Sequence, residues 1–290
     1  MVLAEDFRSL EVTLALRRGR PRTVFIEEAG PDEIRVSVRG RAPSAAGAGE
    51  IRDRIRHLLH LDQDLSGFYE LASTDADLSW VTAGAGRMIR MPTVFEAVIK
   101  TICTTNVSWG GTTKMVGALV EHLGEPAAGA PETGWRGRAF PTPAAMAERD
   151  EAFYRDTVRS GYRGPYLRAV AASAAEGAVD LEHLGRATPE ELPDEELEAR
   201  LLALPGIGPY GAAHVMMLIG RSSLLILDAW TRPTYARLRR SRRPVSDATI
   251  LRRFRRYGRH AGLAFWCYLT RDWVPGAGEA KLGLAPATGG

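Results

Sequence analysis

The sequence predicts an α+β fold, in which an N-terminal antiparallel β-sheet is followed by an all-helical body. Apolar and polar residues alternate from Leu10 to Leu16, and residues 23–27 and 34–38 form two further strand-like runs. Turn signals at Arg18-Gly19 and Gly30-Pro31 separate these runs, as expected for an antiparallel sheet. From about residue 50 onward the pattern changes to that of helices.

Length and composition limit the class of protein. A chain of 290 residues, 45% hydrophobic and 25% charged, is typical of a soluble globular protein with one large domain or two ordinary ones. Neither a signal segment nor an apolar run of membrane-spanning length occurs, so we expect a cytoplasmic protein. Cys103 and Cys267 are too few for a disulfide framework and predict free, buried thiols. No zinc-binding spacing is present, and no permanent cofactor is implied.

Two helix starts carry capping signals. Thr93 as a cap, or Pro92 as the first residue, predicts the start of a long apolar helix that runs through Ile102. Thr142 is a candidate cap for a later helix, because Pro143 after it suits the first helical position.

Stretches rich in Gly, Ala and Pro predict loops and the ends of domains. Residues 42–49 and 124–140 are of this kind, and we expect both to be loops. The chain after Pro275 has the same composition, which predicts disorder. The expected division is a β-rich domain at 1–90, a helical domain at 91–275 and a disordered tail at 276–290.

The stretch LPGIGPY at residues 204–210 predicts a tight hairpin between two helices. Residues 194–202 form a short helix by their apolar spacing, and Asp194 can accept from its first free amides. Gly206 and Gly208 allow positive φ or close backbone approach, and Pro209 suits the start of the next helix. Such a loop presents backbone amides that can receive a phosphate, although an ordinary helical hairpin is the simpler interpretation.

Asp228 follows the apolar run 224–227 and precedes a helix expected to begin near Ala229. It can therefore act as an N-cap, or as a fixed anion beside a reacting group. The two roles are compatible, because capping amides and the helix dipole both favour the ionised carboxylate.

Residues 204–230 together resemble the signature of the helix-hairpin-helix (HhH-GPD) DNA glycosylases, which is a hairpin, a Gly/Pro-rich loop and an aspartate about twenty residues later. Further segments match the family in order, namely CTTN at 103–106, SGYRGPYLRA at 160–169 and AGLAFWCYLTRDW at 261–273. The resemblance runs from Leu10 to Trp273 and is to 8-oxoguanine and 3-methyladenine DNA glycosylases. It implies an N-terminal sheet followed by a helical HhH-GPD glycosylase body.

The resemblance implies a catalytic role for Asp228 and a base pocket lined by Tyr210, Tyr268 and Trp230. Bifunctional family members carry a lysine at the position of Tyr210, and that lysine forms a Schiff base with the sugar. A phenol cannot form this imine, which favours a monofunctional enzyme that uses water. Tyr210 and Tyr268 could instead be ordinary core aromatics.

The resemblance also implies contacts with duplex DNA, which would be the partner of a monomeric, nucleoid-associated protein. The implied DNA-binding residues are Gly206, Gly208, Pro209, Tyr162, Arg163 and Asn106. The backbone carbonyls of Leu204 and Ile207 could share a monovalent cation with a phosphate. Asn106 could equally be a polar helix end, and Tyr162 and Arg163 could be an anchor and a surface arginine in a turn.

Three functions remain open from the sequence. Tyr210 and the missing lysine favour base-excision repair of alkylated purines such as 3-methyladenine, by base flipping. The alternatives are an 8-oxoguanine DNA glycosylase and a non-catalytic protein that binds damaged DNA.

Arginines crowd the segment 237–259, although the formal net charge of the whole chain is only +3. Either a solvated basic face or contact with an anionic polymer explains this clustering.

Overall fold

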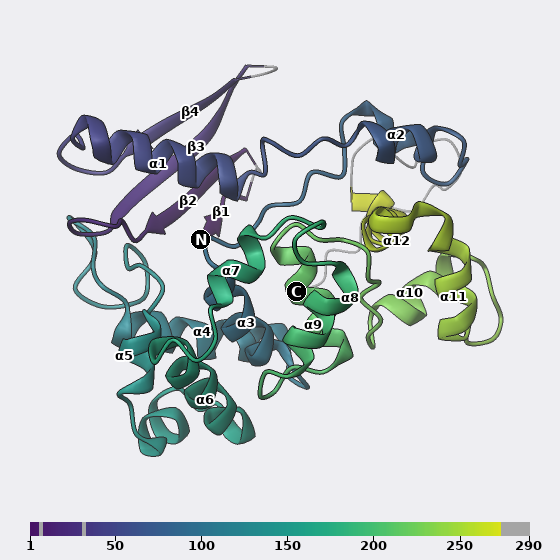
Figure 1. The fold of residues 1–290 in the computed structure, drawn as a ribbon. Helices are drawn as coiled ribbons and strands as arrows, with labels where there is room; N and C mark the ends of the chain where they lie inside the picture. Colours follow the sequence, from purple (N-terminus) through teal and green to yellow (C-terminus); the bar gives the residue numbers. More distant parts are fainter. Residues whose placement is uncertain (6–7, 31–32, 274–290) are drawn as a thin grey trace. The chain divides into compact units, whose positions relative to one another are not determined.

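The computed structural model describes residues 1–5, 8–30 and 33–273 and has the predicted α+β architecture (Figure 1). Its sheet is antiparallel, with the strand order β1-β2-β3-β4. The strands are β1 (Val2–Leu3), β2 (Ser9–Leu14), β3 (Arg22–Gly30) and β4 (Glu33–Val38). The helices follow the sheet, which confirms the predicted fold class.

The chain divides into two compact units. The first unit comprises Met1–Leu58, Met91–Ala187 and Ala203–Ile207. The second comprises Leu59–Arg90, Thr188–Leu202 and the chain from Gly208 onward. Both units are therefore discontinuous in sequence. The boundaries predicted at residues 90 and 275 stay a prediction, and the tail predicted at 276–290 lies outside the described residues.

The sheet of the first unit is buried on one face. Leu10 pairs with Ile26 and Val12 with Val24, and these four side chains are buried. Helix α1 (Ala45–Leu58) lies across the sheet and buries Ile51, Ile55 and Leu58. The predicted alternation to Leu16 is cut short, because β2 ends at Leu14.

The loop predicted at residues 42–49 is wrong, because α1 begins at Ala45. The Ser44 hydroxyl accepts from the amide of Gly47 at 3.2 Å and so acts as a cap. Alanines fill the first turn and have a high helix propensity, which outweighs the two glycines there.

The helical part of the first unit keeps most of the predicted boundaries. Thr93, not Pro92, begins the long apolar helix, since its side chain accepts from the amide of Glu96. Thr142 caps the helix that starts at Pro143. Residues 124–140 contain one isolated bridge, Pro126 with Arg138, and otherwise form the predicted loop. The elements are α3 (Val94–Thr104), α4 (Trp109–Leu123), α5 (Pro143–Ala147), the π-helical turn η2 (Phe153–Thr157), η3 (Gly161–Arg163), α6 (Gly164–Ala175) and α7 (Leu181–Arg186).

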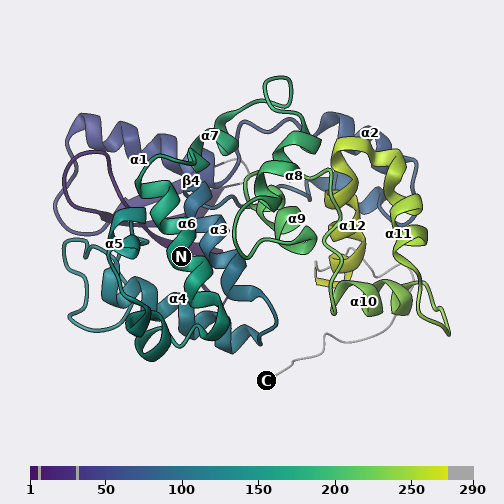
Figure 2. The same cartoon turned by 60° about the horizontal axis from the view of Figure 1, so that its bottom comes forward.

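The second unit is helical and has an aromatic core. Helices α10, α11 and α12 pack together (Figure 2), and their buried rings include Tyr235, Phe254 and Tyr268. The helix predicted at 261–273 ends at Thr270 and continues as a 3₁₀ turn. The elements are α2 (Ser66–Ser73), η1 (Ser79–Ala83), α8 (Asp194–Leu202), α9 (Pro209–Leu218), α10 (Thr231–Leu238), α11 (Asp247–Phe254), η4 (Arg255–His260), α12 (Ala261–Thr270) and η5 (Arg271–Trp273).

Both cysteines are free and buried, as predicted. Burial raises the pKa of each thiol, Cys103 and Cys267, to about 12, so neither is a thiolate at neutral pH. Within the described ranges, no helix combines the length and apolarity needed to span a membrane.

The buried carboxylate of Asp75 links two segments of the second unit that are far apart in the sequence. Asp75 is 6% exposed and accepts from Tyr257 and Arg253, each at 2.6 Å, and also from Arg256. Burial alone would raise the pKa of Asp75, but the hydrogen bonds from Tyr257 and Arg253 outweigh it and lower the pKa to about 2. Asp75 thus fixes the segment around η1 to α11 and η4.

We expect Asp75→Asn to lower the free energy of unfolding by about 2 kcal/mol at pH 7, because it removes the buried anion that accepts from Arg253, Arg256 and the buried Tyr257 hydroxyl. Because the folded-state pKa lies below the usual value, the stabilisation is present above about pH 4 and is lost as the pH falls toward about 2. Urea titrations of both proteins across this range test the expectation. Asp53→Asn, at an exposed position of α1, is the control and should change little. Equal stability of Asp75→Asn and wild type would contradict the assignment.

Candidate functional site

The predicted hairpin is formed, with α8 and α9 joined through residues 203–208. Gly206 adopts the left-handed region at φ +82°, and the amide of Ile207 donates to the carbonyl of Leu204 at 3.1 Å. Gly208 is extended and precedes Pro209, the first residue of α9. No side chain among the described residues caps α9, so its first amides remain available to another acceptor.

Within the first unit, Tyr166 of the SGYRGPY segment packs closely against the hairpin loop at Gly206. A Cβ atom at Gly206 would lie 2.9 Å from the ring of Tyr166. A glycine is therefore required here both for its backbone conformation and for this close approach.

Asp228 lies at the start of the turn that leads into α10. Its Oδ1 accepts from the amides of Trp230 at 2.8 Å and Thr231 at 2.7 Å. In return, the amide of Asp228 donates to the Thr231 hydroxyl at 2.8 Å. These reciprocal bonds fix the carboxylate in the turn before α10, which begins at Thr231 with Trp230 as its N-cap instead of near Ala229 as predicted. No described residue donates to the second oxygen, Oδ2.

A close backbone approach positions the segment before Asp228. The amide of Gly262, in α12, donates to the carbonyl of Ser222 at 2.7 Å. A Cβ atom at Gly262 would lie 2.0 Å from the carbonyl oxygen of Leu224, so only glycine permits this contact. The run 224–227 is partly buried, with Leu225 and Ile226 in two core clusters.

Helix α9 carries Tyr210 and His214, which are half-buried and lie one helical turn apart. Their ring centroids are 5.5 Å apart, and Tyr210 packs on the cluster that contains Ile226. Burial lowers the pKa of His214, while the charge of Asp228 acts in the opposite direction. Asp228, His214 and Tyr210 therefore belong to one neighbourhood of the second unit.

His214 is a residue that the sequence interpretation missed. Its Nδ1 is buried and has no hydrogen-bond partner among the described residues. The only available signal was its spacing of four residues from Tyr210, which places both on one face of a helix.

Trp230 lies in a cluster of three indole rings. Its centroid is 5.8 Å from that of Trp266 and 5.7 Å from that of Trp273. Trp230 is 40% exposed and Trp273 is 64% exposed, so this cluster forms an open aromatic surface. Trp230 is only two residues from Asp228, which keeps that surface close to the carboxylate.

The structure corrects the place predicted for Tyr268. Tyr268 is 1% exposed and packs in the core between Tyr235 and Phe254, at ring distances of 5.5 and 5.7 Å. Two residues in a helix are about 200° apart, so Tyr268 and Trp266 point in opposite directions from α12. Trp266 is the residue of α12 that contacts Trp230.

The structure also corrects the role predicted for Arg163. Its guanidinium is buried and donates to the carbonyls of Thr105, at 3.1 Å from Nε, and of Ser160, at 3.2 Å. It stacks on Tyr162, whose ring centroid is 4.5 Å away. Arg163 thus ties two loops together instead of projecting into solvent, and these carbonyls satisfy the donors of its buried guanidinium.

Asn106 and Tyr162 lie side by side on the surface of the first unit. Asn106 has φ +47°, and its Nδ2 donates to the Tyr162 hydroxyl at 3.2 Å. Hydrogen bonds from Thr105 and Asn106 lower the pKa of Tyr162, which is half exposed. Trp109, the first residue of α4, is a highly exposed aromatic that the sequence interpretation overlooked.

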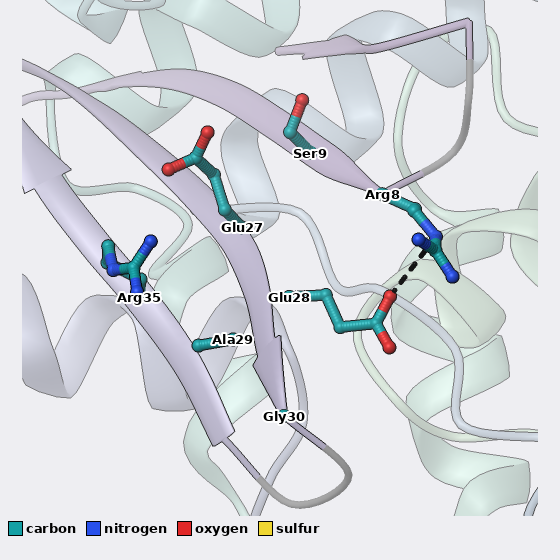
Figure 3. Close-up of a pocket in the computed structure, with 7 residues that line it drawn as sticks. All are labelled: Arg8, Ser9, Glu27, Glu28, Ala29, Gly30 and Arg35. Carbon is teal, nitrogen blue, oxygen red and sulfur yellow. Dashed lines mark ion pairs between the residues drawn. The ribbon is translucent and has the colours of Figure 1, made fainter.

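A hollow of about 410 Å³ lies on the sheet, away from every predicted site residue in sequence (Figure 3). Its charges are mixed, and Arg8 and Glu28 form an ion pair at 3.4 Å. It contains no arrangement typical of a reaction centre. Its lining residues are Arg8, Ser9, Glu27, Glu28, Ala29, Gly30 and Arg35.

No protein-family model matches the chain, and no protein of curated function matches it either. Solved structures do share its fold. A 3-methyladenine DNA glycosylase from Archaeoglobus fulgidus aligns with a TM-score of 0.68 and 20% identity, covering 92% of this chain and 88% of that one. The 8-oxoguanine glycosylase/lyase of Clostridium acetobutylicum, in complex with DNA that contains cytosine opposite 8-oxoguanine, gives 0.67 and 21%, covering 90% and 87%.

A third structure is the 3-methyladenine DNA glycosylase of Schizosaccharomyces pombe in complex with abasic DNA. It aligns with a TM-score of 0.54 and 17% identity, over 72% of this chain and 97% of that one. These likenesses confirm, at the level of the fold, the resemblance that the sequence motifs indicate.

We expect Gly262→Ala to lower the free energy of unfolding by about 3 kcal/mol, because the added methyl group collides with backbone that cannot move aside. Thermal unfolding measures the effect. The control is Gly67→Ala in α2, where a Cβ meets nothing within 4 Å. Unchanged stability of Gly262→Ala would show that the segment before Asp228 is held in another way.

Arg163→Ala should also lower the free energy of unfolding by about 2 kcal/mol, because it removes the hydrogen bonds that the buried guanidinium donates to the carbonyls of Thr105 and Ser160. Urea denaturation is the test. Arg168→Ala, an exposed arginine of the next helix, provides the comparison and should be nearly neutral. If both variants keep wild-type stability, Arg163 is not the tie between the loops.

Proposed function

We propose that this chain is a monofunctional DNA glycosylase, which hydrolyses the N-glycosidic bond of damaged, alkylated purines in duplex DNA. The observation that carries the proposal is the fixed carboxylate of Asp228, which follows the Ile226 cluster on which Tyr210 of α9 packs. The fold, shared with 3-methyladenine and 8-oxoguanine DNA glycosylases, supports it. We expect a monomer that acts on chromosomal DNA in the cytoplasm.

Asp228 is suited to the charge that the reaction develops. As the bond between base and sugar breaks, its electrons leave with the base and positive charge grows on the sugar. A carboxylate whose Oδ1 is held by two amides can present Oδ2 to this charge without reorganising. Water then adds its oxygen to the anomeric carbon, and its proton passes to the carboxylate and on to solvent.

The residues present favour hydrolysis over strand cleavage. Tyr210 cannot form an imine with the sugar, unlike a lysine. Lys100 and Lys114 both lie in the first unit, outside the hairpin, and Lys281 lies outside the described residues. The product is therefore an abasic site in an intact strand.

The aromatic residues favour an electron-poor base as the substrate. A purine alkylated on a ring nitrogen carries positive charge, which aromatic faces attract through their quadrupoles. Tyr210 and the exposed indole surface of Trp230 and Trp273 offer such faces, and the carboxylate of Asp228 adds a negative charge. A neutral His214 does not repel a positively charged base. An 8-oxoguanine base is neutral and gains less from these groups.

We propose further contacts with the DNA backbone and the opposite strand. Amides at Gly206, Gly208 and the start of α9 after Pro209 suit a phosphate, because no side chain occupies them. The Leu204 carbonyl already accepts from Ile207 and keeps a second lone pair, so a monovalent cation there stays a proposal. Asn106 and Tyr162 offer polar groups to a base or phosphate, while Arg163 acts only by holding their loops.

Asp228→Asn should slow base release at least about a thousandfold, because the amide keeps the shape of the side chain but lacks its negative charge. Single-turnover release of free base from methylated duplex, with alkali treatment to reveal abasic sites, measures this. Binding of undamaged duplex should stay close to that of wild type.

The matched control is Asp180→Asn, which alters another capping aspartate, at the start of α7. It should leave base release unchanged. Parallel assays with 8-oxoguanine duplex separate the alternatives. Strand nicking without alkali would indicate a lyase, and duplex binding without any base release would indicate a non-catalytic DNA-binding protein.

A further inference from the structure

Seven of the ten arginines between residues 237 and 259 fall into two sets with different surroundings. Arg253 and Arg256 bind Asp75 inside the second unit. A second set is exposed and lies at the end of α10 and in the turn after it. We define this set as the arginine turn, which consists of Arg237, Arg239, Arg240, Arg242 and Arg243.

The guanidinium groups of the arginine turn are not paired with any residue that the structure describes. The nearest acidic residue along the chain, Asp247, binds Arg232 through two hydrogen bonds of 2.7 and 2.9 Å. The charges of the arginine turn therefore repel one another without an internal anion to offset them. Such a cluster is the electrostatic signature of a surface for an anionic polymer.

The backbone of the arginine turn is held by hydrogen bonds. The amide of Arg240 donates to the carbonyl of Arg237, and that of Ser241 donates to Ala236, both at 2.9 Å. The Ser241 hydroxyl donates to the carbonyl of Arg243 at 2.7 Å. Arg240 takes the left-handed conformation that ends a helix, at φ +53°. The arginines are thus presented in a defined arrangement.

Helix α10 fixes the distance between the arginine turn and Asp228. Asp228 caps the turn into α10, and the arginine turn begins in the last turn of the same helix. Eight helical residues span about 12 Å. Thr231 and Tyr235 bury the inner face of α10 in the second unit, so both ends move as one body.

We propose that the arginine turn is a second contact with the backbone of duplex DNA, on phosphates about three to four nucleotides from the sugar that faces Asp228. This inference rests on the proposed function, because Asp228 sets the origin of the distance. Guanidinium groups suit phosphates, since their fork of donors matches two phosphate oxygens. The contact is independent of sequence and would hold the duplex while the damaged nucleotide is extruded.

The test compares wild type with a variant in which Arg239, Arg240, Arg242 and Arg243 are all changed to Gln. These side chains are exposed, so the fold should be kept, which thermal unfolding checks. The dissociation constant for undamaged duplex is measured from about 50 to 200 mM salt. The slope of the logarithm of the association constant against the logarithm of the salt concentration should become less steep by about 3. Binding at low salt should weaken tenfold or more. The control changes an equal charge on exposed arginines of the first unit, namely Arg18, Arg20, Arg41 and Arg52 to Gln.

Shortened duplexes locate the contact. Duplexes are shortened to about two base pairs beyond the lesion, on one side at a time. On the side where the shortening removes the contacted phosphates, wild type and the arginine-turn variant should bind equally. An unchanged salt slope, or a loss of binding to anionic lipid vesicles with DNA binding intact, would overturn the proposal.

The outcome is separable from that of the proposed function. If wild type releases no base but the variant loses duplex affinity, the catalytic proposal fails and the arginine contact stands. If wild type releases base and the variant binds as tightly as wild type, the arginine contact fails and the catalytic proposal stands.

Discussion

The second unit depends on the reciprocal hydrogen bonds between Asp228 and the first turn of α10. They satisfy backbone amides that a helix start leaves without partners, and they hold a carboxylate in one orientation. A carboxylate that is already fixed costs little to reorganise when positive charge develops nearby. The same bonds therefore serve folding and chemistry, and the Gly262 contact with the Ser222–Leu224 backbone places them.

Helices α9, α10 and α12, with the turn before α10, contribute the aromatic side chains around this carboxylate. Helix α9 brings Tyr210 and His214, while Trp230 before α10 meets Trp266 of α12. Each of these helices also buries an opposite face in the core, as Tyr268 shows. Because the side chains of a helix point in fixed directions, the same packing that stabilises the unit decides which aromatic residues are exposed.

Local signals in the sequence were sufficient for the fold class, the hairpin and the caps at Thr93 and Thr142, because these depend mainly on neighbouring residues. They were insufficient where tertiary packing decides. Arg163 occupies a turn, where arginines are usually solvated, yet Thr105 and Ser160 bury it. The burial of Tyr268 depends on which face of α12 packs against the core, and local sequence signals do not determine that face. His214 belongs to no sequence motif, and only the structure shows that the charge of Asp228 acts on it.

The most direct test is a crystal structure of Asp228→Asn bound to duplex DNA with an alkylated purine. We expect an extruded nucleotide, with the side chain of residue 228 within about 3.5 Å of its anomeric carbon. The base should lie against Tyr210 and His214. A base that stays stacked in the duplex, or a sugar held far from residue 228, would show that Asp228 is not the catalytic carboxylate.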